Sequence, residues 1–402
     1  MAPKGLMILV EFANLSFLPN NTKADFDSLA NGKNYTYNGA TGSAQAYFKA
    51  QSNGQYVPQF DVVGPVKLHQ TYAYYGTNPA GDFDQYIADF VIDAVELAYD
   101  SLHVDFSQYD HDKDGEVDFV YLLYAGKGEA DGGAAATIWP LNWELKSALC
   151  FGYTNQSKYY YTETNSKLPT FNNKRIDNFA CSAELRRSGD RSGIGTLCHE
   201  FTHVLGLPDY YITDEYAATM SPMTTPGDWS LMGSACYLNY GNTPCHYSAY
   251  DKFCLGWVTP QVLSVAQDVT LPADGKTYYM ITRDGQMPQA GYACTDTVYY
   301  LENRQQTGWD TYLPGHGMLI WQVVYDDEMW ENNTPNDYST RYCLLTADHT
   351  PPYDAKGGAP YPGTQAVTSL QLFSYQLSHI TEKDGVITFR FGEESPTDMV
   401  TL

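Results

Sequence analysis

The residues best suited to carry chemistry lie in one short segment, 199–209, which reads HEFTHVLGLPD. His199 and His203 are four residues apart, so on an α-helix their side chains would lie one turn apart and could reach the same metal ion. Gly206 can end the helix in the left-handed conformation and turn the chain so that Asp209 comes back toward that ion. Two imidazoles and a carboxylate leave one tetrahedral position for water. The spacing therefore predicts a catalytic zinc site with His199, His203 and Asp209 as ligands.

Glu200 is the predicted general base. It follows His199 directly, and about 100° of rotation on a helix places its carboxylate beside the metal instead of among the ligands. Zinc lowers the pKa of its bound water from about 9 toward about 7. Glu200 would accept a proton as this water attacks a carbonyl carbon, and would return the proton to the leaving amine. The predicted reaction is hydrolysis of peptide bonds.

Other interpretations of this segment stay open. A helix can carry two histidines and a glutamate on its solvated side, and a zinc site can be inactive if no cleft is open. The chain also has 35 Tyr and 7 Trp, residue types that are enriched at binding surfaces. The alternative function is therefore a cell-surface module that binds carbohydrate or protein and holds a non-catalytic zinc ion.

A second group of carboxylates lies in the segment 110–118, DHDKDGEVD. Asp110, Asp112, Asp114 and Asp118 occupy relative positions 1, 3, 5 and 9, with a glycine at position 6, as at the start of an EF-hand-type calcium loop. Position 12 is a tyrosine instead of the bidentate glutamate, and a strand follows instead of a helix, so another carboxylate or water must complete the shell. We predict that these four carboxylates bind calcium, the alternative being a solvated acidic turn.

The zinc segment needs a helix that fixes its orientation. Leu197, Phe201 and Leu205 recur every four residues, which predicts a helix over 194–205 with one apolar stripe. Each histidine is two positions from a member of this stripe, about 200° around the helix. The stripe can therefore pack inward while the histidines face a cleft.

The remaining patterns predict a mixed α+β fold. Apolar residues follow helical spacing over about 82–102, and strand-forming runs cover 6–12 and 117–124. Further strand-like runs lie at 278–282, 298–302, 318–324, 342–346 and 386–391. The sequence therefore predicts an α+β catalytic domain over residues 1–260 and a mostly β domain over residues 261–402.

Several segments resemble a known family. The pattern HExxHxxGxxD resembles the elongated zinc signature of the metzincin clan, with Asp at the third ligand position where many members have His. The chain resembles more closely the immune inhibitor A family of secreted bacterial metallopeptidases. The segments that carry this resemblance, in order, are 39–56, 105–118, 138–140, 194–211, 227–237, 247–260 and 313–321. The resemblance implies a metzincin-like catalytic domain, with a mixed sheet and an active-site helix.

The resemblance also implies roles for individual residues. His199, His203 and Asp209 would bind zinc, Glu200 would be the base, and Met232 would form the Met-turn beneath the metal. From the residues alone, this methionine could equally be an ordinary buried one.

One feature of some metzincins does not carry over. They place a tyrosine that stabilises the oxyanion two residues after the Met-turn methionine, and here that position is Ser234. Tyr237, Tyr240 and His246 are left as candidates for this role.

Composition bounds the partners and the location. The chain has 23 Lys and Arg against 47 Asp and Glu, a net charge of −24, which excludes a basic surface for nucleic acid. No apolar run approaches the ~18 residues of a transmembrane helix. The partners expected are protein or peptide substrates. The family resemblance implies a secreted or cell-surface bacterial protein whose signal peptide is absent from this sequence. Eight cysteines without CxxC spacing leave both disulfides and buried thiols open.

Overall fold

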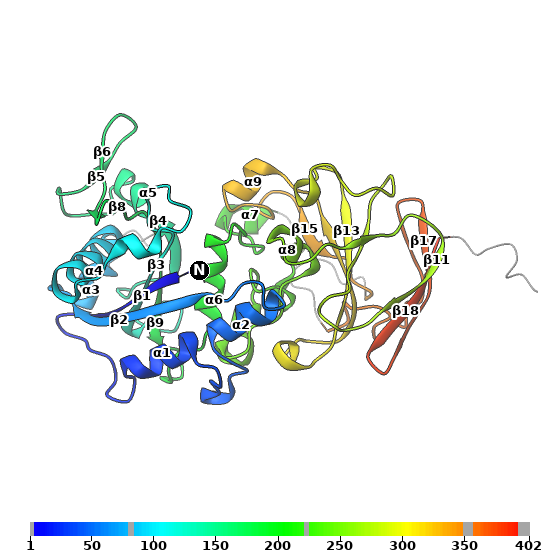
Figure 1. Ribbon diagram of the computed structural model, residues 1–402, viewed down its shortest axis with the longest axis horizontal. Helices are drawn as coiled ribbons and strands as arrows, with labels where there is room; N and C mark the ends of the chain where they lie inside the picture. Colours follow the sequence, from blue (N-terminus) through cyan, green and yellow to red (C-terminus); the bar gives the residue numbers. More distant parts are fainter. Residues whose placement is uncertain (1–3, 79–83, 221–224, 349–356, 393–402) are drawn as a thin grey trace, which may run out of the picture. The chain divides into compact units, whose positions relative to one another are not determined.

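A computed structural model describes residues 4–78, 84–220, 225–348 and 357–392, which form two compact units (Figure 1). The first unit comprises Met1–Lys49, Tyr56–Leu205 and Tyr240–Asn242, and the second comprises Ala50–Gln55, Gly206–Asn239 and Thr243–Leu402. The sequence predicts a domain boundary near residue 260, and this boundary stays a prediction.

The first unit is built on a five-stranded sheet in the order β2-β1-β3-β9-β4. Its strands are β1 Lys4–Glu11, β2 Gln59–Lys67, β3 Val120–Lys127, β4 Leu141–Glu144 and β9 Asn178–Leu185. Four of them are parallel, and β4 runs antiparallel beside β9 at one edge. Six of the eight residues of β1 and seven of the eight of β3 are buried, as in parallel strands covered on both faces. Both strands predicted for this unit are confirmed, with small shifts at their ends.

Helices cover the two faces of this sheet. They are α1 Lys23–Asn31, α2 Ala44–Gln51, α3 Tyr72–Tyr75, α4 Ile87–Leu102, α5 Leu145–Cys150 and α6 Gly195–Val204. Apolar residues of α4 share a buried cluster with Leu6 and Leu122. Phe201 of α6 packs on the other face, where its ring centroid is 5.2 Å from that of Phe60 and 5.1 Å from that of Phe119.

Both predicted helices are confirmed with shorter bounds. α4 ends at Leu102 because His103 takes a left-handed φ of 54° and closes the helix. Its predicted first residues, Asp82 and Phe83, lie outside the described residues. α6 fits within the predicted range 194–205. Two short hairpins, β5 Tyr160–Tyr161 with β6 Ser166–Lys167 and β7 Thr170–Phe171 with β8 Lys174–Arg175, complete the strands of this unit that the structure describes.

The second unit is rich in β-structure. One sheet has the order β10-β12-β13-β14-β15 and a second has the order β11-β18-β17-β16. The strands of the first are β10 Gln261–Val262, β12 Tyr279–Ile281, β13 Val298–Arg304, β14 Gly317–Val323 and β15 Tyr342–Leu344. Those of the second are β11 Gln267–Leu271, β16 Leu370–Leu372, β17 Tyr375–Lys383 and β18 Val386–Phe391. Each strand-like run predicted beyond residue 260 contains a strand.

Three short helices also belong to the second unit: α7 Glu215–Met220, α8 Ala249–Cys254 and α9 Asp327–Glu331. Apolar side chains of both sheets, such as Leu301 and Phe389, share one buried cluster. Across the described ranges of the whole chain, no helix is long and apolar enough to cross a membrane.

Candidate metal centre

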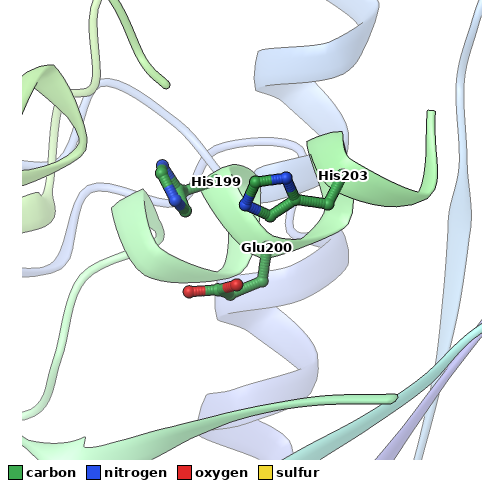
Figure 2. A group of neighbouring side chains, drawn as sticks. All are labelled: His199, Glu200 and His203. Carbon is green, nitrogen blue, oxygen red and sulfur yellow. The ribbon is translucent and has the colours of Figure 1, made fainter. Parts of the chain in front are cut away.

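Helix α6 carries three side chains whose metal-binding atoms gather in one place. His199, Glu200 and His203 each offer a nitrogen or oxygen atom, and these atoms lie within 4.8 Å of one another (Figure 2). The two imidazole rings are nearly perpendicular, with centroids 5.0 Å apart. Imidazole nitrogens and carboxylate oxygens are the donors that catalytic zinc sites use, so this group fits zinc.

Packing on the opposite side of α6 fixes its rotation. Leu197 and Phe201 are buried, and the Phe201 ring also meets Phe48 edge to face with centroids 5.1 Å apart. At the entry to the helix, a Cβ atom on Gly193 would lie 2.2 Å from the carbonyl oxygen of Gly241, so only glycine fits there. Leu205, the third member of the predicted stripe, is half-buried, so the prediction of a buried stripe is confirmed for Leu197 and Phe201 and is wrong for Leu205.

The group lies in a largely dry environment beside the sheet. His199 and Glu200 are each 7% exposed, and His203 is half-buried. On β3, the Tyr121 hydroxyl donates a 2.5 Å hydrogen bond to Ser182 Oγ. Burial raises the pKa of Tyr121 well above its usual value, and the charge of Glu200 raises it further. This phenol therefore stays protonated at neutral pH.

Asp209, the predicted third ligand, is held by a residue far along the chain. The Asp209 N–H donates to Asn333 Oδ1 at 2.6 Å, and Asn333 Nδ2 donates to Asp209 Oδ2 at 2.8 Å. Asp209 is 4% exposed. Gly206 has a φ of 94°, so the predicted left-handed turn after the helix is confirmed. The assignment of Asp209 as a zinc ligand stays a prediction.

Met232 lies in the second unit, in a turn closed by a 3.0 Å hydrogen bond from the Gly233 N–H to the carbonyl oxygen of Ser230. Its side chain is buried, and its carbonyl oxygen accepts a 2.8 Å hydrogen bond from the N–H of Tyr210. This bond ties the Met232 backbone to the residue that follows Asp209. The Met-turn role of Met232 stays a prediction, as does the alternative of an ordinary buried methionine.

The three oxyanion candidates lie in different environments. Tyr237 and Tyr240 are 64% and 77% exposed, and the Arg186 guanidinium stacks on the Tyr240 ring. Burial lowers the pKa of His246 to about 3, and its Nδ1 lies 2.7 Å from Gln51 Oε1. His246 is therefore a neutral imidazole within the second unit.

The acidic loop is brought together only in part. Asp110, Asp112 and Asp114 offer oxygen atoms within 4.8 Å of one another, whereas Asp118 pairs with His111 through a 2.6 Å contact between Oδ2 and Nδ1. The buried carboxylate of Asp110 also forms an ion pair with the ammonium group of Lys174. This ammonium holds the pKa of Asp110 below its usual value. Sequence reasoning missed Lys174, which lies 64 residues away with no local signal.

A cleft of about 420 Å³ in the first unit is lined by residues of the acidic loop and by His203. The acidic loop contributes Asp112, Asp114 and Asp118 to its lining, and His203 at the end of α6 and the C-cap residue Leu205 contribute as well. His203, a predicted zinc ligand, is half-buried and borders this cleft. A substrate could therefore reach its imidazole.

A helix that carries two imidazoles and a carboxylate at HExxH spacing, with His203 at the border of a cleft, is typical of a zinc metallopeptidase site. The chain belongs to the immune inhibitor A peptidase M6 family, because the model of that family's catalytic domain matches residues 3–257. The family resemblance inferred from the sequence is thereby confirmed.

Two bacterial proteins illustrate the similarity. The chain is 26% identical over 262 residues to the pre-pro-metalloprotease PrtV of Vibrio cholerae serotype O1, a match that covers 58% of this chain and 26% of PrtV. It is 26% identical over 228 residues to immune inhibitor A of Bacillus thuringiensis subsp. alesti, which covers 51% of this chain and 30% of that protein. The chain thus spans less than a third of the length of these relatives.

Proposed function

We propose that the chain is a zinc-dependent endopeptidase that hydrolyses protein substrates. The observation that carries the proposal is the group of His199, Glu200 and His203 on α6, which lies within the part of the chain matched to the family's catalytic domain. The cleft beside His203 adds support, because a peptidase must admit an extended chain to its metal.

The residues of α6 would divide the work. His199 and His203 would hold the metal, and Asp209, which lies beyond the end of α6, would complete the protein ligands. Zinc, when bound, supplies a Lewis acid that polarises the scissile carbonyl. Glu200 accepts a proton from the attacking water and donates it to the leaving amine. Its low exposure keeps bulk water from competing for that proton.

The test is cleavage of casein or gelatin by the purified chain. Activity should disappear when a chelator removes zinc and return when zinc is added back, with about one zinc bound per active chain. Zinc binding without cleavage would favour the alternative of a non-catalytic binding module.

We also propose that the protein acts outside the bacterial cell. The family match and the similarity to a protein named as a pre-pro-metalloprotease support this proposal. Fractionation of the source bacterium should recover the chain from the medium or the cell surface. Recovery from the cytoplasm alone would contradict it.

We propose a structural calcium ion at the acidic loop, with Asp110, Asp112, Asp114 and Asp118 as the predicted ligands. The mutual approach of the first three carboxylates supports the proposal. Calcium must displace the Lys174 ammonium from Asp110, and Asp118 must turn away from His111 or act through water.

Added calcium should raise the melting temperature of the parent chain, because an ion that binds only the native state stabilises it. At a hundredfold excess over Kd the gain is about 2.7 kcal/mol. The double variant Asp112→Asn with Asp114→Asn should lose this response and keep its zinc. The matched control replaces two exposed carboxylates outside the loop, Asp27→Asn with Asp100→Asn. Equal calcium responses in both double variants would show that the loop is a solvated turn.

A further inference from the structure

Asn333 makes two hydrogen bonds to Asp209, one to its backbone and one to its side chain. Its Oδ1 accepts the backbone N–H of Asp209, and its Nδ2 donates to the Oδ2 atom of the same residue. An amide offers one acceptor and one donor group, so this orientation of Asn333 matches both groups of Asp209. The two residues are 124 positions apart in the chain. A pair of hydrogen bonds at such a separation fixes both the backbone and the carboxylate of Asp209.

The backbone around Asn333 is built to present this side chain. Asn333 follows helix α9 closely and has a left-handed φ of 60°, a conformation that asparagine tolerates better than most residues. Three residues later, the buried Asn336 donates to the carbonyl oxygen of Tyr210 at 2.9 Å. Asp337 accepts hydrogen bonds from the N–H and the hydroxyl of Thr213.

These contacts align two segments of the second unit. Residues 333–337 run beside residues 209–213, and the ring of Tyr210 stacks on that of Tyr342 with centroids 3.7 Å apart. The first segment lies beyond residue 257, where the match to the family's catalytic domain ends. A part of the chain outside that match therefore holds the residue predicted to complete the zinc site.

We propose that Asn333 is a positioning residue for Asp209 as the third zinc ligand, an inference that rests on the proposed function. An N–H donor on one carboxylate oxygen restricts the orientation of the carboxylate. Groups that hydrogen-bond a metal ligand in this way orient it for the ion, and their loss costs about 10- to 100-fold in metal affinity or activity. Asn333 would supply this support from the C-terminal part of the chain.

The test measures zinc affinity of the full chain by competition with a chelator. Asn333→Asp keeps the acceptor for the Asp209 N–H but removes the donor to Oδ2, and asparagine and aspartate both tolerate left-handed φ. Asn333→Gly keeps the backbone conformation accessible and removes the side chain without adding charge. Both variants should bind zinc about 10- to 100-fold more weakly than the parent.

The control is Tyr338→Phe. It removes the hydrogen bond from the Tyr338 hydroxyl to Asp214 Oδ2, which joins the residues that directly follow these two segments, and it leaves the hydrogen bonds of Asp209 in place. Zinc affinity should stay at the parent value. If Tyr338→Phe weakened zinc binding as much as Asn333→Gly, the effect would come from general loosening of the segments and the inference would be wrong.

A double-mutant comparison separates this inference from the function beneath it. Asp209→Asn alone should weaken zinc binding, and adding Asn333→Gly should then change the affinity little, because the carboxylate that Asn333 positions is gone. If Asp209→Asn had no effect, the proposed ligand set and this inference would both fail. If Asp209→Asn weakened binding but neither Asn333 variant did, only the positioning role would fail.

Discussion

Replacement of Glu200 by alanine should lower the turnover of a protein substrate by about 10²- to 10⁴-fold, the range that one general acid or base contributes. Zinc should stay bound, because His199, His203 and Asp209 remain. The fold should persist as well, since α6 is held by Phe201 and its aromatic neighbours on the opposite side. The measurements are kcat on a peptide substrate, zinc content, and the melting temperature of the zinc-loaded chain.

The control for Glu200→Ala is Glu163→Ala, which removes an exposed glutamate of the same unit. Its turnover should equal that of the parent. Substantial residual turnover in Glu200→Ala with full zinc occupancy would assign the proton transfer to another group. Lost zinc in Glu200→Ala would instead make Glu200 a ligand, which its position within 4.8 Å of the imidazole nitrogens permits.

Local patterns predicted the elements that carry the chemistry. The stripe of Leu197 and Phe201 predicted α6, because burial of one helix face leaves apolar residues at helical spacing. The continuous apolar run of β1 predicted a strand buried on both faces. The order β2-β1-β3-β9-β4 leaves no such record. Strand β9 pairs with β3 across more than fifty intervening residues, and only the packed sheet specifies that partnership.

In the candidate site as well, relations within one helix were predictable from the sequence, and contacts between distant residues were not. The relation of His199 to His203 depends on helix geometry alone, so four-residue spacing was enough. The hydrogen bonds between Asn333 and Asp209 join residues 124 positions apart. The ion pair between Lys174 and Asp110 joins residues 64 positions apart. No local sequence pattern at Asn333 or Lys174 indicates which distant residue it contacts.

His203→Ala should lose both zinc and activity, in contrast to Glu200→Ala. Removing an imidazole deletes a bond to the metal itself, so the loss of zinc affinity should exceed the roughly 10- to 100-fold expected when a group that only supports a ligand is removed. His203 is half-buried and borders the cleft, so alanine leaves a small opening toward solvent and little packing is lost. Zinc affinity by chelator competition and turnover at several zinc concentrations are the two measurements.

The dependence on zinc concentration separates the ligand from the base. In His203→Ala, excess zinc should raise occupancy and restore part of the turnover, because Glu200 is still present to accept the proton. In Glu200→Ala, excess zinc should change nothing, because the site is already full. The exposed His69 offers the matched control, and His69→Ala should keep the parent affinity. A His203→Ala chain that holds zinc as tightly as His69→Ala would remove His203 from the ligand set, and the four-residue spacing on α6 would then need another explanation.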